Sequence, residues 1–226
     1  MISMRSPAVD QGSRPTVTGA ARGPSRRLAS APYVCAALHA AALLVMLLVL
    51  RGGTEAEPRL AARMAYVHEH ATAWRAGFGV WMLAGMSVVA FYAWWAGALR
   101  SRAAAVSAVV VTCAGLACDL SGEALYSAWL PLLSDDAARF EQVQRLGTVL
   151  TAVFANGFYT AAGIVLTLGT PGLPSRVRML AWVVWTAGIA LSIAGAAGWA
   201  AGLVVASGAL FPALVLLALM LPRALR

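Results

Sequence analysis

Apolar runs long enough to cross a lipid bilayer recur six times along this chain. They occupy about residues 31–50, 75–99, 103–127, 146–168, 179–198 and 202–222. A helix of roughly twenty apolar residues spans the hydrocarbon core of a bilayer, and inside lipid it satisfies its own backbone hydrogen bonds. Of the 226 residues, 61% are hydrophobic and only 12% are charged, which excludes an ordinary soluble domain. We therefore predict an all-α polytopic membrane protein with six transmembrane helices.

The arginines indicate how the chain is divided and oriented. Residues 1–30 are rich in Ser, Pro, Gly and Arg and have no apolar period, so we predict a disordered basic tail before a transmembrane domain over 31–226. With six spans, the segments on the side of the tail hold eleven Arg and only Asp10, whereas the other side holds six Arg and six acids. Basic residues concentrate on the cytoplasmic side of membrane proteins. We therefore expect both termini to be cytoplasmic, in an inner (plasma) membrane of bacterial type.

The largest polar connection, residues 52–74, predicts a short amphipathic helix at the outer membrane surface. After Pro58 the apolar residues recur at helical spacing: Leu60, Met64, Val67, Ala71 and Trp74. The same segment contains His68 and His70. Side chains two residues apart on a helix point about 200° apart, so these two imidazoles do not converge on one ion. The three cysteines lie inside apolar runs without a C-x-x-C motif, and we expect neither a metal nor a cofactor.

The third apolar run carries two carboxylates, Asp119 and Glu123, which we call the acidic pair. Helical spacing places them on one stripe with Gly115 and Tyr126. An acidic residue at the centre of a spanning helix costs about 2.5 to 3.5 kcal/mol, so it rarely faces lipid and usually has a partner. Two poorly solvated carboxylates this close do not readily ionise together unless a cation lies beside them. We therefore predict an intramembrane pocket, opening outward, that contains the acidic pair.

Further residues are candidates for the same pocket. Arg75 and Arg145 enter neighbouring runs on the outer side and are the available cations, and two histidines lie in the connection before Arg75. Asn156, near the middle of the fourth run, either joins helices by a hydrogen bond or lines the same cavity. The candidate ligand- or proton-binding residues are Asp119, Glu123, Tyr126, Asn156, Arg75, Arg145, His68 and His70.

Other residues are expected to have structural roles. His39 is the one histidine inside an apolar run, which favours a hydrogen bond between helices over a haem ligand, because a second histidine at that depth is lacking. Tyr92, Trp94 and Trp95, near the end of the second run, predict an aromatic belt at the membrane interface. Ser134 is the expected N-cap of the helix that leads into the fourth run.

Three classes of function fit these residues. The first is a protein that binds or transports a small lipophilic or cationic molecule or protons, with the bilayer and that ligand as its partners. The second is a membrane-embedded enzyme that uses the acidic pair as acid or base on a lipid or isoprenoid, assisted by a histidine. The third is a structural subunit of a larger membrane complex, in which the acids pair with arginine. We favour the first class, because the polar stripe continues inward through Gly115 and Thr112.

Sequence motifs do not decide between these classes. The chain contains no H-E-x-x-H, P-loop, G-x-G-x-x-G or G-x-S-x-G motif. Its net charge of +8 comes from arginines scattered between apolar runs and not from one basic face, so nucleic acid is not an expected partner. The sequence therefore leaves open whether the protein is an enzyme, which ligand it binds and whether it has membrane-protein partners.

Overall fold

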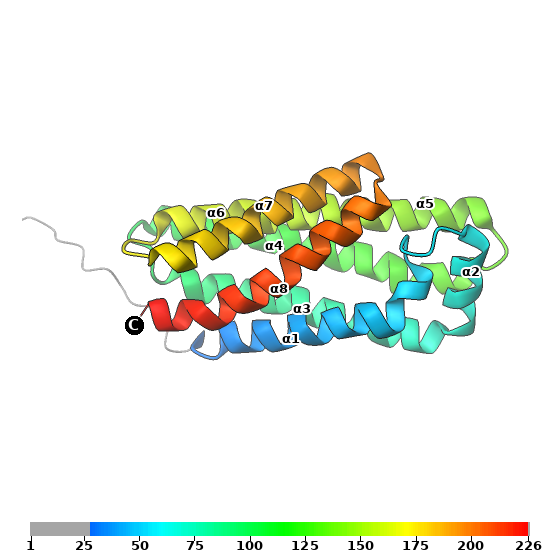
Figure 1. Ribbon diagram of the computed structural model, residues 1–226, viewed down its shortest axis with the longest axis horizontal. Coiled ribbons are helices and arrows are strands. Elements are labelled where there is room, and N and C mark those ends of the chain that lie inside the picture. Colours follow the sequence, from blue (N-terminus) through cyan, green and yellow to red (C-terminus); the bar gives the residue numbers. More distant parts are fainter. Residues whose placement is uncertain (1–27, 226) are drawn as a thin grey trace, which may run out of the picture.

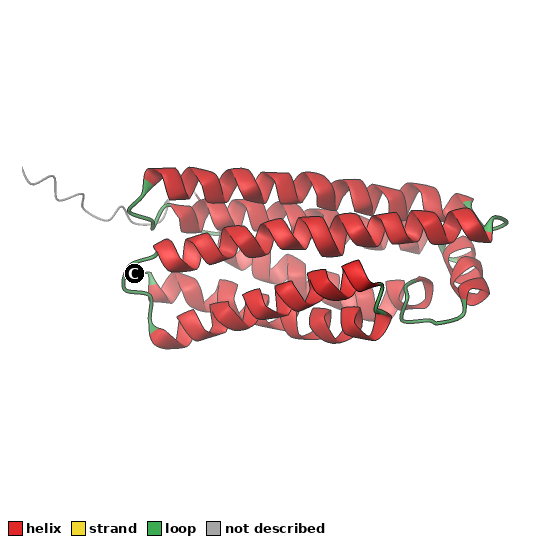
Figure 2. Ribbon diagram, turned by 90° about the horizontal axis from the view of Figure 1, so that it is seen from above, coloured by secondary structure: helices red, strands yellow, loops and turns green. Residues whose placement is uncertain are grey.

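The computed structural model describes residues 28–225, so the predicted tail lies almost wholly outside the described residues. Within this part every regular element is helical (Figure 2). The α-helices are α1 (Ala31–Val45), α2 (Leu60–Glu69), α3 (Ala71–Ala96), α4 (Arg102–Ala124), α5 (Ala137–Thr148), α6 (Asn156–Gly169), α7 (Ser175–Ala197) and α8 (Ala200–Ala224). Segments of π-helix follow α1 (Met46–Leu50) and α4 (Leu125–Trp129) and join α5 to α6 (Val149–Ala155), and 3₁₀ turns follow at Arg51–Gly53 and Leu130–Leu132.

Six helical segments are long and apolar enough to cross a membrane. They are Ala31–Gly53, Ala71–Ala96, Arg102–Leu132, Ala137–Gly169, Ser175–Ala197 and Ala200–Ala224. These segments confirm the predicted all-α, six-span architecture. The fourth segment differs most from the prediction, because it begins at Ala137 and not near residue 146. Its first part, α5, is polar on one side, so hydropathy alone identified only the continuation beyond it.

The six spans form a closed ring of neighbours. α1 packs on α3, α3 on α4, α4 on α6, α6 on α7, α7 on α8, and α8 returns to α1 (Figure 1). Side chains that point into the ring therefore meet helices that are not their neighbours. Trp81 of α3, for example, contacts Phe211 of α8 with 4.8 Å between ring centroids. Such contacts fill the interior of the bundle.

The two ends of the bundle differ in character. α1 begins and α8 ends at one end, which we call the terminal end (Figure 1). The short helix α2 lies at the opposite end, which we call the α2 end, and it is the helix predicted for the largest polar connection. Its apolar residues Met64 and Val67 are buried in a cluster with Trp74, Leu50 and Phe140. The apolar face of α2 thus closes this end of the bundle.

An aromatic cluster fills the interior towards the terminal end. Tyr92, Trp94 and Trp95 are at most 4% exposed, so the prediction that they form an interfacial belt is wrong. Trp95 stacks on Trp185 of α7 at 6.4 Å, and its Nε1 donates to the Thr170 hydroxyl at 2.9 Å. Trp185 and Thr170 are distant from Trp95 in the sequence and were not visible as its partners. These contacts hold the aromatic rings inside the bundle.

Gly163 permits the close contact of α6 with α7 beside this cluster. A Cβ at this position would overlap the Trp185 ring, whose Nε1 donates to the Thr167 hydroxyl at 2.9 Å. We expect Gly163→Ala to lower the free energy of unfolding by about 1 to 3 kcal/mol, because a rigid, hydrogen-bonded indole must shift. Thermal unfolding in detergent measures this loss. Gly208→Ala is the matched control, since a Cβ there meets nothing within 4 Å, and equal losses in both variants would contradict the explanation.

Candidate functional site

Asp119 lies where α3, α4 and α6 meet. Its Oδ2 accepts a hydrogen bond from the Tyr159 hydroxyl of α6 at 3.1 Å. On the other side it faces Gly85 of α3, where a Cβ would come within 2.7 Å of the same oxygen. The Tyr159 ring in turn packs over Gly115, one turn before Asp119 on α4. Two glycines thus provide the space for an acid and its hydroxyl partner inside a tightly packed interface.

Glu123 lies one helical turn further along α4 and is only 3% exposed. Its Oε2 is buried and has no hydrogen-bond partner in the described part of the chain. Native proteins pair about nine in ten or more of their buried polar groups, and an unpaired one costs roughly 1 to 3 kcal/mol or more. An unpaired carboxyl oxygen at this depth therefore requires an explanation, and it makes Glu123 the first candidate for a functional residue.

A second unpaired polar atom lies at the level of Glu123. Gly85 of α3 faces Asp119 of α4. Phe78, seven residues before Gly85, stacks on Tyr126, seven residues after Asp119, with 5.0 Å between the ring centroids. The two helices are therefore antiparallel, and residues equally far from Gly85 and Asp119 in these directions lie at the same level. Trp81 lies four residues from Gly85 and therefore at the level of Glu123. Its Nε1 is also buried and has no hydrogen-bond partner among residues 28–225. The sequence analysis did not select Trp81 as a site residue, because only the register between the helices reveals it.

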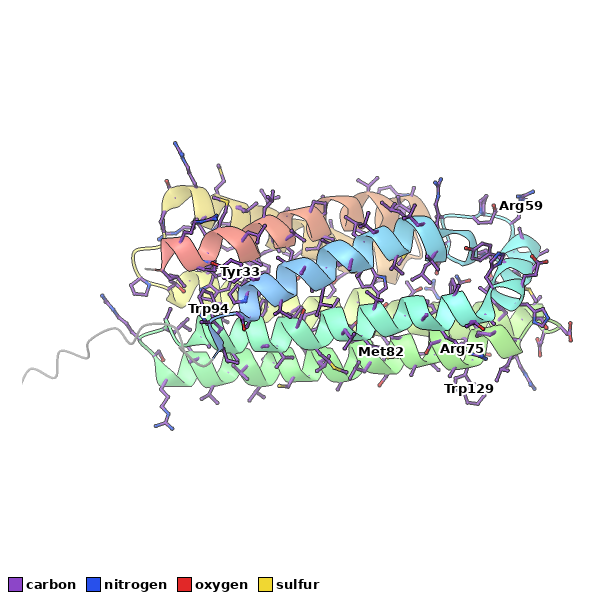
Figure 3. All side chains as sticks on the ribbon, turned by 90° about the horizontal axis from the view of Figure 1, so that it is seen from below. Tyr33, Arg59, Arg75, Met82, Trp94 and Trp129 are labelled. Atoms are coloured by element: carbon purple, nitrogen blue, oxygen red, sulfur yellow. The ribbon has the colours of Figure 1, made fainter. Side chains whose placement is uncertain are left out.

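The predicted cations do not pair with the acids. Within residues 28–225 the ion pairs join Arg59 to Glu57 at 2.8 Å and Arg139 to Asp136 at 3.2 Å. Arg75 is exposed, and its Nε donates to the carbonyl oxygen of Ser127 at 3.3 Å. Arg59 at the α2 end and Arg75 are labelled in Figure 3.

The second predicted cation is also turned away from the acidic pair. Arg145 is exposed, and its guanidinium lies beside Gly198, in the turn between α7 and α8. Neither arginine therefore provides the charge that the acidic pair lacks.

The two histidines lie far from the acidic pair. His68 and His70 are exposed at the end of α2, and the His70 ring stacks on Tyr66 at 4.3 Å. The continuous helix α3 begins directly after His70, and Gly85, which faces Asp119, is fifteen residues further along. At 1.5 Å per residue this separation is roughly 22 Å along the helix axis. The structure thus does not bring either imidazole to the carboxylates.

The remaining predicted site residues take part in other hydrogen bonds. Asn156 Nδ2 donates to the Gly188 carbonyl oxygen at 2.6 Å and to the Ser192 hydroxyl at 2.9 Å. These bonds join α6 to α7, in agreement with the alternative in which Asn156 connects helices. The Tyr126 hydroxyl lies 2.7 Å from the Thr148 hydroxyl. Tyr126 is three residues after Glu123, in the π-helical segment that follows α4.

His39 and the surface grooves lie outside this cluster. His39 is buried, and its Nδ1 lies 2.9 Å from the Cys35 carbonyl oxygen within α1. One shallow groove of about 360 Å³ lies between α6 and α7. Another of about 240 Å³ is lined by Arg75 and Met82 of α3 and by Ser127. Arg75 and Met82 are labelled in Figure 3. Neither groove is lined by Asp119 or Glu123. The described residues contain no group of three His, Cys, Asp or Glu placed to hold a metal ion.

No known protein family, curated protein or solved structure matches this chain. Its class therefore rests on the fold and the site themselves. They define a multi-pass helical protein with an acidic pair on α4, in which Glu123 is buried and the partly exposed Asp119 lies at the junction of α3, α4 and α6.

Proposed function

We propose that this protein moves protons across the membrane and that the acidic pair is its intramembrane proton-binding site. The observation that carries the proposal is the buried, unpartnered Oε2 of Glu123 beside a second carboxylate that has no cation partner in residues 28–225. A pair of acids in such surroundings is costly when both are ionised, and a bound proton removes that cost. The Tyr159 hydroxyl donates to Asp119, which leaves Glu123 as the carboxyl that carries the proton.

Close packing favours the proton over a larger ligand. The Asp119 carboxylate is so near the backbone of α3 that even a methyl group at Gly85 would meet it. The two surface grooves do not reach the acids. A proton needs no cavity, because it moves along carboxyl and hydroxyl groups by exchanging hydrogen bonds.

The other two classes of function find less support in this geometry. The enzyme requires a histidine within one water of a carboxylate, whereas His68 and His70 lie at the end of α2. The structural subunit requires an ion pair with Arg75 or Arg145, whereas Arg75 contacts Ser127 and Arg145 lies beside Gly198. With the topology predicted from the arginines, the α2 end faces outward from an inner membrane, and the acidic pair lies in the outer half of the bilayer.

Proton flux into lipid vesicles tests the proposed function. The purified protein is reconstituted with a trapped pH-sensitive dye, and a potassium diffusion potential drives proton entry. We expect an internal pH change well above that of protein-free vesicles, together with an infrared carbonyl band of a protonated carboxyl group in the purified protein. Flux equal to that of protein-free vesicles would overturn the proposal.

A further inference from the structure

We infer that Glu55, Thr148 and Tyr126 form the route by which protons pass between the α2 end and the acidic pair. This inference rests on the proposed function and adds the entry point that the function requires. It depends on a chain of hydrogen bonds that begins at the partly exposed carboxylate of Glu55 and ends at the hydroxyl of Tyr126, the residue three positions after Glu123.

The chain joins three segments that are far apart in the sequence. The Thr148 hydroxyl donates to Glu55 Oε1 at 2.9 Å and lies 2.7 Å from the Tyr126 hydroxyl. Glu55 is partly exposed in the connection between α1 and α2, whereas Tyr126 belongs to the π-helical segment after α4. The hydrogen bonds therefore lead from the surface at the α2 end into the bundle.

Gln144 of α5 holds the chain in place. Its side chain accepts from Arg63 Nη1 at 2.7 Å and donates to the Gly53 carbonyl oxygen at 3.2 Å. Its backbone carbonyl oxygen is an alternative acceptor for the hydroxyls of Thr148 at 3.1 Å and Tyr126 at 3.3 Å. Each hydroxyl thus has a second acceptor within reach. The O–H groups can rotate out of the chain and back without a change in helix packing.

Apolar and aromatic groups surround Tyr126. Its ring stacks on Phe78 at 5.0 Å, and its carbonyl oxygen accepts from Trp74 Nε1 at 2.8 Å. These rings belong to the cluster that closes the α2 end. Apolar and aromatic side chains offer a proton no acceptor, so we assign its passage at this level to the hydroxyl and carboxyl groups.

Both helices that carry the chain become π-helical at this level. The segment Leu125–Trp129 begins two residues after Glu123 and contains Tyr126, and Val149–Ala155 begins directly after Thr148. Short π-helical segments in α-helices occur frequently at functional sites. The π-helical segments therefore lie at the same level of the bundle as the hydrogen-bond chain, which supports a functional role for this level.

The hydrogen bonds define how a proton is passed. Thr148 donates to Glu55, so Tyr126 can donate to Thr148. Glu123 Oε2 has no hydrogen-bond partner among the described residues, so the Glu123 side chain must first turn towards Tyr126. For release, Glu123 then gives its proton to the Tyr126 oxygen while Tyr126 gives its own proton to Thr148. Thr148 then gives its proton to Glu55. One proton leaves Glu123, one reaches Glu55, both hydroxyls end neutral, and rotation of their O–H groups restores the chain.

Glu55→Gln in the full-length protein tests the route. The amide oxygen of Gln still accepts from Thr148, so the fold is kept, but the amide does not carry a proton. We expect proton flux in vesicles to fall by about tenfold or more, as when a positioned acid or base is lost. The infrared band of the buried carboxyl group should persist, because Glu123 is unchanged. Tyr126→Phe should lower flux in the same way.

Glu57→Gln is the matched control, since Glu57 lies in the same connection and pairs with Arg59 on the surface. Its flux should equal that of the unmodified protein. Unchanged flux in Glu55→Gln, with flux intact in the unmodified protein, would overturn the route and leave the proposed function standing. Equal losses in Glu55→Gln and Glu57→Gln would assign the effect to surface charge and also overturn the route. Absence of flux in the unmodified protein would overturn both.

Discussion

Proton flux through the Glu123→Gln protein is expected to fall to the level of protein-free vesicles, a loss of about a hundredfold if the buried carboxyl is the obligatory carrier. Gln has nearly the size and shape of Glu, so the packing of α4 against α3 should be unchanged. The amide neither gains nor loses a proton at ordinary pH. The infrared band of the protonated carboxyl should disappear in this variant, which separates loss of the carrier from loss of the fold.

Glu141→Gln is the matched control for this measurement. Glu141 is an exposed acid on α5, and its replacement should change neither flux nor the infrared band. Asp119→Asn should also reduce flux, because the Tyr159 hydroxyl then faces a neutral amide in place of a carboxylate. Flux that persists in Glu123→Gln would show that protons cross elsewhere in the bundle.

The six spans and the inward stripe of the acidic pair were predictable because both are local properties of the sequence. Hydropathy over about twenty residues identifies a span, and the 3.6-residue period places Asp119, Glu123 and Tyr126 on one face. The structure confirms the spans and encloses Glu123 within the bundle.

The partners of the acidic pair were not predictable, because they depend on the register between helices. Tyr159 is forty residues from Asp119 in the sequence, and no local pattern connects them. Arg75 and Arg145 were natural candidates by depth, but depth alone does not fix the direction in which a long side chain points. Both guanidinium groups lie at the surface of the bundle.

Helix boundaries show a similar limit. Ser134 was the expected N-cap before the fourth span, whereas Asp136 takes that position and accepts from the Arg139 amide at 3.0 Å. Residues of both types cap helices well, so composition alone does not choose between them. The π-helical segments beside Glu123 were also not predicted, since they depend on packing and not on residue type.

The hydrogen bonding of the acidic pair favours the proposed transport role over a purely structural one. A purely structural acid would be expected to have its oxygens paired, as those of Glu57 and Asp136 are with arginines at the surface. Glu123 instead keeps a buried oxygen that has no hydrogen-bond partner within residues 28–225. An unpaired buried oxygen lowers the stability of the fold. The proposed function accounts for this loss, because the carboxyl group binds a proton and releases it through hydroxyl groups.

Gly85→Leu should abolish proton flux even though it leaves both carboxylates in the sequence. A Cβ at Gly85 would lie 2.7 Å from Asp119 Oδ2, so the larger side chain must displace the carboxylate from the Tyr159 hydroxyl. Overpacking of this kind costs about 1 to 3 kcal/mol of stability, and displacing Asp119 also breaks a hydrogen bond. Flux in vesicles and thermal unfolding in detergent measure the two effects on the same preparation.

Gly79→Leu provides the comparison on the same helix. Gly79 is also in α3, and a Cβ there meets nothing within 4 Å, so the change in helix propensity is matched while the acidic pair is untouched. We expect this variant to retain flux and stability. Because the two substitutions lie six residues apart on one helix, a difference between them isolates the contact with Asp119. Equal flux in the Gly85 and Gly79 variants would show that the position of the Asp119 carboxylate does not control proton movement.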